Sequence, residues 1–301
     1  MFIQLLSSII TSLCILLGVA FFTLLERKVL GLVQIRKGPT KVGLIGMIQP
    51  LADALKLFVK EKVVPNGSNQ ALFLMAPIMA LVLGLALWYL NPSSSASKAM
   101  SWGLLLFFCI SALNVYTTML AGWSSNSKYA FLGAIRASAQ TISYEVSMIM
   151  ILLFPAFCIS SSSWYEAYKM FPVIILFLPS AVIWFASSLA ETNRAPFDFA
   201  EGESELVSGF NIEYGGGPFA LLFLAEYSVI LFMSLGTVVW FFHSSTMVLL
   251  VLQTLVISSI FLWVRGAFPR HRYDLLMGLC WKSFLPFSLC VFTIVSISLI
   301  I

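Results

Sequence analysis

The feature that most constrains this chain is a series of apolar runs, each long enough to cross a lipid bilayer. A spanning helix needs about 20 consecutive apolar residues. Such runs lie near residues 2–25, 71–90, 102–121, 138–159, 171–190, 218–242, 247–264 and 284–301. Only 10% of the 301 residues are charged, whereas a soluble domain carries about 25%. We therefore predict an all-α polytopic membrane protein, with about eight transmembrane helices that form one domain over residues 1–301.

The distribution of basic residues predicts how the helices are oriented. Fifteen of the 17 lysines and arginines lie in alternate connections, which are 26–70, 122–137, 191–217 and 265–283. The opposite side holds only Lys98 and Lys169. Because basic loops stay on the side of synthesis, these connections should face a bacterial cytoplasm or an organelle matrix. The first apolar run is followed by charged residues rather than by a cleavage site, so we expect it to be a retained helix.

Several kinds of site are excluded by motif. The five cysteines form no CxxC pair, and clustered thiolates are what zinc and iron–sulfur sites require. The sequence contains no GxxxxGK[ST] motif and no GxGxxG motif after a strand. We expect no metal ion, nucleotide or nucleic acid to bind this chain.

The first basic loop, residues 26–70, contains a predicted amphipathic surface helix. Pro50 occupies a position at which helices often begin. Four apolar residues recur at helical spacing and three charged residues share the opposite face; they are Leu51, Leu55, Phe58 and Val59, and Asp53, Lys56 and Lys60. The basic residues of this loop suit either anionic phospholipid headgroups or an acidic protein surface. A plain interfacial anchor fits the pattern as well.

The connection 191–217 is acidic although the whole chain has a net charge of +4. Its only base is Arg194, and its acids are Glu191, Asp198, Glu201, Glu203, Glu205 and Glu213. These carboxylates alternate with large apolar side chains, which a fully solvated loop would not favour. We therefore predict that this acidic matrix loop is buried or covered by protein.

Two further acids lie inside predicted spans. Glu145 and Glu226 are each roughly 10 Å from the basic side of the membrane, at 1.5 Å per helical residue, and Glu191 marks the same end of the fifth run. A charge in the bilayer centre costs about 2.5–3.5 kcal/mol on the lenient scale. Helix packing alone does not require acidic side chains at this free-energy cost, so these residues predict a proton or ion path.

These segments together resemble one known family. The strings LERKVLGLVQIRKGP (25–39), AETNRAPFDFAEGESELVSGFNIEY (190–214) and FPRHRYDLLMGLCWK (268–282) are similar to those of subunit 1 of the respiratory NADH:ubiquinone oxidoreductase, complex I, of the mitochondrial type. The resemblance runs the whole length of the chain. His271 departs from the aromatic residue expected at its position.

The resemblance implies a core membrane subunit at the membrane end of a ubiquinone-binding tunnel, where the proton-coupling path also begins. It implies tunnel residues Arg27, Arg36, Asp53 and Phe223. It implies coupling residues Glu145, Glu191, Asp198, Glu201, Glu203, Glu205 and Glu226. Flavin mononucleotide and the iron–sulfur clusters would belong to other subunits, with no redox centre in this chain. The partners would be membrane-arm and soluble-arm subunits and phospholipid, in the mitochondrial inner membrane with the long loops facing the matrix.

Other interpretations remain open at this stage. An autonomous ion or proton antiporter would also need intramembrane glutamates, although such transporters usually contain inverted repeats. A passive anchor for a soluble assembly would explain the basic loops but neither Glu145 nor Glu226. Helix packing could account for Phe223, and lipid headgroups for the arginines.

Overall fold

The computed structural model describes residues 2–92, 100–199, 202 and 209–300, and helices are the only regular secondary structure within them. In chain order the longer helices are α1 (Phe2–Val33), α2 (Gln49–Val59), α3 (Gln70–Leu87), α4 (Gly103–Ser124), α5 (Lys128–Ile159), α8 (Leu178–Glu191), α10 (Gly217–Phe241), α11 (Met247–Ala267) and α13 (Leu285–Ile300). The short helices α6 (Trp164–Ala167), α7 (Val173–Leu176) and α12 (Tyr273–Leu279) lie between them. The prediction of an all-α polytopic membrane protein is confirmed.

Seven helical stretches within the described residues are long and apolar enough to cross a membrane. The fifth predicted span, 171–190, is not among these seven, because it is divided into α7 and α8 at Phe177. The backbone of Phe177 is not helical, and Pro179 in the first turn of α8 has no N–H to continue the helical ladder. The Phe177 ring packs instead on Phe287 of α13 and Phe154 of α5, with centroids 5.8 and 6.0 Å apart.

The helices extend beyond the apolar runs that predicted them. Helix α1 continues through Glu26 and Arg27 to Val33, eight residues past the predicted end of its span, and α5 begins at Lys128 rather than near 138. A π-helical turn, Cys280–Phe284, joins α12 to α13 where the predicted loop 265–283 ends. Hydropathy marks the part of a helix that lies in lipid, whereas backbone hydrogen bonding continues into the interface.

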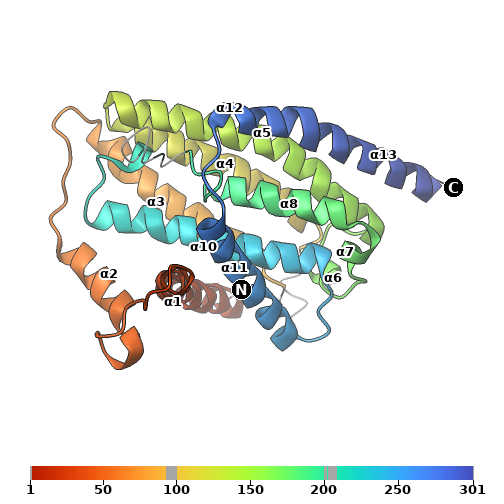
Figure 1. The fold of residues 1–301 in the computed structure, drawn as a ribbon, viewed down its shortest axis with the longest axis horizontal. Coiled ribbons are helices and arrows are strands. Elements are labelled where there is room, and N and C mark those ends of the chain that lie inside the picture. The colour runs from red at the N-terminus through yellow and green to blue at the C-terminus, as the bar shows by residue number, and fades with distance from the viewer. Residues whose placement is uncertain (1, 93–99, 200–201, 203–208, 301) are drawn as a thin grey trace.

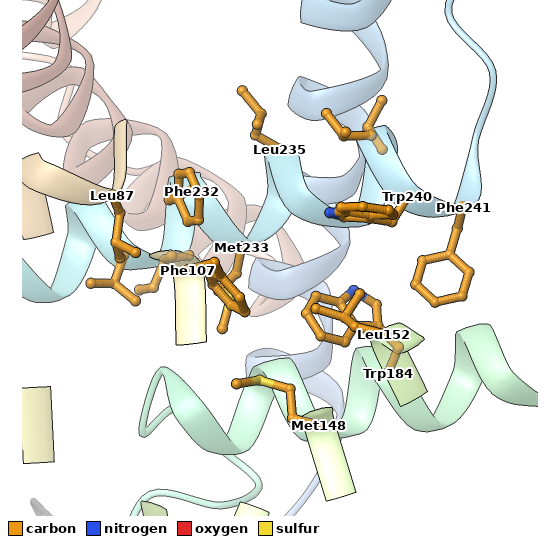
Figure 2. Packing of buried hydrophobic residues seen from close by; sticks show 14 of the residues in the cluster. Leu87, Phe107, Met148, Leu152, Trp184, Phe232, Met233, Leu235, Trp240 and Phe241 are labelled. Carbon is orange, nitrogen blue, oxygen red and sulfur yellow. The ribbon is translucent and has the colours of Figure 1, made fainter. Parts of the chain in front are cut away.

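Helix α10 is the centre of the bundle. Figure 1 shows it between α1 and α11 on one side and α5 with α13 on the other. Its sequence is apolar on nearly every side, which is typical of a helix that is buried all round. Figure 2 shows Phe232, Met233 and Trp240 of α10 packed towards Phe107 of α4 and Trp184 of α8. This central packing fixes the positions of the surrounding helices and their polar side chains.

Helix α2 lies apart from the bundle, next to the C-terminal end of α1 (Figure 1). Pro50 is in its first turn, as the sequence indicated. Its apolar stripe is exposed, with Leu55 66% and Val59 83% accessible. The opposite edge of α2 approaches α1 and α10, which makes it one wall of the cavity described next.

Candidate functional site

A cavity of about 430 Å³ lies between α1, α2 and α10, with one residue contributed by the end of α11. Its wall is mostly apolar and includes Val19, Leu30, Leu57, Phe58, Phe219 and Leu224. Six polar side chains also line it, which are Thr23, Glu26, Arg27, Asp53, Tyr227 and Arg265. An apolar pocket with a few polar groups is typical of sites for small apolar molecules that carry polar atoms.

Three of the four predicted tunnel residues meet at this cavity. Arg27 of α1 and Asp53 of α2 form an ion pair, and Gln49 donates a hydrogen bond of 2.9 Å to the other Asp53 oxygen. Phe223 of α10 lies on the same wall, with its ring 4.4 Å from that of Phe219 between centroids. The fourth predicted residue, Arg36, does not line the cavity. Helix α1 ends at Val33, and Arg36 is exposed on the loop that follows it.

The sequence analysis did not identify the most buried charged group at this cavity, Glu26. Glu26 is only 3% exposed, and its carboxylate accepts hydrogen bonds from Arg194, Arg265 and Tyr227. The Arg194 guanidinium also lies 4.4 Å from the centre of the Tyr227 ring. In the sequence Glu26 only ended an apolar run. The structure shows that α1 stays helical through Glu26, which places this residue on a packed helix rather than in a loop.

A second, smaller cavity of about 40 Å³ brings two of the predicted coupling residues together. Glu191, at the end of α8, and Glu226, on α10, both line it. Three polar side chains of α4 contribute to the same wall, which are Asn114, Thr117 and Thr118. Glu191 is 5% exposed, and its Oε2 atom has no hydrogen-bond partner among the described residues. Polar space beside a buried carboxylate can admit water or a proton donor.

Glu145 on α5 is close enough to Glu191 for the two carboxylates to repel each other. It is half-buried, and its Oε1 atom has no hydrogen-bond partner within the described part of the chain. Glu145 and Glu226 are therefore both neighbours of Glu191, one through electrostatic repulsion and the other through the shared cavity. We call these three residues, Glu145, Glu191 and Glu226, the intramembrane acid cluster.

The first described stretch of the acidic connection, residues 191–199, is held against the bundle. Gln140 of α5, which is fully buried, donates hydrogen bonds of 3.0 Å to the carbonyl oxygens of Ala190 and Phe197. Asp198 pairs with Arg270 at 3.1 Å, which joins this segment to the last basic loop. Three predicted coupling residues of the connection, Glu201, Glu203 and Glu205, lie outside the described residues.

No group of three or more His, Cys, Asp or Glu side chains in the described residues could hold a metal ion. The arginines and carboxylates of the larger cavity are paired with one another instead. The paired charges of the larger cavity suit the transient binding of a neutral molecule. The intramembrane acid cluster suits proton exchange.

The family model and the relatives that match this chain indicate the same family. Residues 6–296 match the family model described as NADH dehydrogenase. Similar relatives include proteins named NADH-ubiquinone oxidoreductase chain 1. That of Aedes aegypti is 54% identical over 293 residues, covering 95% of this chain and 93% of its own length. That of Xenopus laevis is 51% identical over 288 residues (92% and 89%), and that of Lampetra fluviatilis is 48% identical over 307 residues (98% and 95%).

Proposed function

Because this chain belongs to the NADH dehydrogenase family, as a subunit 1 of complex I, we propose that its larger cavity is the membrane end of a ubiquinone-binding tunnel. As a complex I subunit, it works with other subunits of an NADH:ubiquinone oxidoreductase. The observation that carries the proposal is the meeting of Arg27, Asp53 and Phe223 at one apolar cavity with paired charges.

The cavity suits the two chemical parts of ubiquinone. The isoprenoid tail is apolar and gains from the aromatic and aliphatic wall of α1, α2 and α10. The quinone ring has two carbonyl oxygens that accept hydrogen bonds, and Arg27 and Arg265 carry guanidinium donors on the same wall. Each arginine is paired with a carboxylate, so the cavity presents donors without a large uncompensated charge.

We propose the intramembrane acid cluster as the start of the proton-coupling path. Glu191 is buried, Glu145 and Glu226 are half-buried, and the last two are neighbours of Glu191. A change of charge on one of them alters the field at its neighbour, so that protons are taken up or released. Asp198 and the acids Glu201, Glu203 and Glu205 would add further negative charge on the matrix side.

In this proposal electrons reach ubiquinone from flavin mononucleotide and iron–sulfur clusters in other subunits, and the chain contributes no redox centre of its own. The long basic connections would face the mitochondrial matrix, towards soluble-arm subunits, while phospholipid of the inner membrane surrounds the apolar helix faces. Family membership favours this function over that of an autonomous ion or proton antiporter.

The test is a charged substitution in the proposed tunnel wall. In the assembled complex, Phe223→Lys should raise the apparent KM for a ubiquinone analogue, because the wall becomes charged. NADH:ferricyanide reduction by the soluble arm should be unchanged. Phe131→Lys, on the exposed face of α5, is the matched control. An unchanged KM in Phe223→Lys contradicts the proposal. If both activities fall together, assembly is disturbed, and Phe223→Trp then tests the wall through its volume alone.

A further inference from the structure

A third cavity, of about 270 Å³, lies between α5, the end of α7 and α13. Its wall includes Phe154 and Cys158 of α5, Leu176 and Phe177 at the end of α7, and Val291 and Val295 of α13. Among the described residues, no charged or amide side chain lines it, and it shares no residue with the larger cavity. We call it the α13 cavity. It suits hydrocarbon rather than a quinone ring, whose carbonyl oxygens would find no strong hydrogen-bond donor there.

The interruption of the fifth predicted span accounts for the α13 cavity. Helix α7 has only four residues, so no continuous helix fills the space between α5 and α13 at this level. The Phe177 ring, which packs on Phe154 and Phe287, joins the two helices on one side. Phe157 of α5 packs on Phe292 of α13 as well, with ring centroids 5.3 Å apart. Because these contacts hold α5 and α13 in place, the helices do not close over the space, and an empty cavity of this size is unfavourable.

The α13 cavity opens towards the membrane. Leu176 and Ile294, both on its wall, are 58% and 65% exposed, and the neighbouring Ile175 and Leu178 are exposed too. Helices α5 and α13 belong to stretches that are apolar enough to cross a bilayer, so the opening is continuous with a surface that faces lipid. Cavities lined by such side chains stay dry. A helix, about 10–12 Å across, is too wide for this space. A flexible hydrocarbon chain from the bilayer fits it.

The connection between α5 and α8 contains a single base, Lys169. Its exposed ammonium donates a 2.6 Å hydrogen bond to the Tyr165 hydroxyl and lies 4.0 Å from the centre of that ring. The ammonium has further N–H donors, and the hydroxyl can still donate its own proton. From Lys169 to Leu176 the chain spans at most about 19 Å, because its last part is the helix α7. A phospholipid is at least as long, since a bilayer is about 40–45 Å thick. One lipid can therefore reach both places.

We propose that the α13 cavity holds one acyl chain of an anionic phospholipid whose phosphate pairs with Lys169. The lipid belongs to the leaflet opposite the basic connections, because Phe154 and Cys158 lie within about 8 Å of the end of α5 at Ile159. Its chain gains van der Waals contact with α5, α7 and α13. It supplies the packing that an uninterrupted fifth helix would provide. This inference is independent of where ubiquinone binds.

The first experiment locates the acyl chain in the intact complex. A phospholipid with a photoreactive diazirine in the middle of one chain is exchanged into the purified complex, and labelled peptides are identified by mass spectrometry after irradiation. We expect labels on the wall, at Cys158, Leu176 and Ile294. Val295→Phe fills the cavity and should remove them. Leu289→Phe, at an exposed position of α13 that does not line the cavity, is the matched control and should keep them.

Two results of this experiment overturn the proposal. One is labelling spread evenly over the exposed residues of α5 and α13. The other is an unchanged pattern in Val295→Phe. If Val295→Phe does not assemble, Cys158→Leu adds a smaller volume to the same wall and gives the same measurement. A wall that takes no label in wild type, because a side chain of another subunit fills the cavity, also overturns it.

The second experiment tests the headgroup. Photoreactive phosphatidylglycerol should label the cavity wall about fivefold more than phosphatidylcholine with the same chains, because one lysine favours an anionic lipid by about that factor. Lys169→Gln should abolish the preference. Lys282→Gln, an exposed lysine before the other end of α13, is the matched control and should keep it. Equal labelling by the two lipids in wild type, or an unchanged preference in Lys169→Gln, overturns the pairing with Lys169.

Discussion

Arg27 of α1 and Asp53 of α2 form an ion pair that joins the surface helix to the first membrane helix, and both residues line the larger cavity. The side chains are 45% and 35% exposed, so the pair contributes at most about 1 kcal/mol to stability. Its position matters more than its strength, because it is a direct side-chain link between α2 and the rest of the wall.

The first prediction follows from this pair. Asp53→Asn keeps the shape of the side chain but leaves Arg27 without its carboxylate. We expect normal assembly on a native gel and an increase of about two- to fivefold in the KM for ubiquinone, corresponding to at most about 1 kcal/mol. Reversing the pair with Arg27→Asp and Asp53→Arg should restore much of the affinity. A double variant that is worse than Asp53→Asn would argue against a role for the ion pair.

The second prediction concerns Glu145. Glu145→Gln preserves volume and polarity and should assemble, but it cannot exchange a proton, so ubiquinone reduction coupled to pumping should be lost. Glu145→Asp should retain part of it. The measurement is NADH:ubiquinone turnover together with proton movement in sealed vesicles, normalised to complex content. Full pumping by Glu145→Gln would exclude this residue and leave Glu191 or the loop acids as the next candidates.

The third prediction concerns close packing between α4 and α5. A Cβ atom on Gly122 would lie 2.3 Å from the Cβ of Ala134 and 2.7 Å from the carbonyl oxygen of Ala130. Gly122→Ala should therefore separate the two helices, at a cost of about 1–3 kcal/mol, and lower both the Tm and the amount of assembled complex. Gly18→Ala in α1 is the control, since a Cβ atom on Gly18 would have no neighbour within 4 Å in the described part of the chain. Equal effects of the two substitutions would refute the packing argument.

The fourth prediction concerns pH and Tyr214, which precedes α10. Burial raises the pKa of Tyr214 from 10.0 to about 12, although a hydrogen bond with Ser124 opposes the shift. Its hydroxyl donates to the carbonyl oxygen of Phe73 at 3.2 Å, and the two rings stack 4.1 Å apart. The folded state therefore holds this proton more tightly than the unfolded state does. The stability it contributes is complete below pH 10 and is lost as the pH rises towards 12.

Tyr214→Phe tests this sign. Below pH 10 the variant should be less stable than wild type, by about 1 kcal/mol for the lost hydrogen bond. The difference in Tm should shrink as the pH rises from 10 towards 12, because only wild type loses stability by ionising Tyr214. A difference that stays constant or grows over that interval would disprove the assignment.

Much of the fold was predictable because a bilayer accepts few structures. Lipid offers no hydrogen bonds to the backbone, so long apolar runs must be helices. The runs therefore located the helices, and the amphipathic spacing from Leu51 to Val59 located α2. The break at Phe177 was not predicted, because its cause is the packing of one aromatic ring against α5 and α13 together with the proline that follows.

The site was predictable in part for a different reason. Phe223, Arg27 and Asp53 were found through the resemblance to a family, and the cavity brings them together. Glu26 was missed, because its partners Arg194, Arg265 and Tyr227 come from three other segments. A helix that is apolar on nearly every side has no sequence pattern that says which face meets which neighbour. The sequence by itself determined which segments are membrane helices and which residues are charged. Only the tertiary structure decided which charges share a carboxylate, because contacts between distant helices are fixed by side-chain packing around α10.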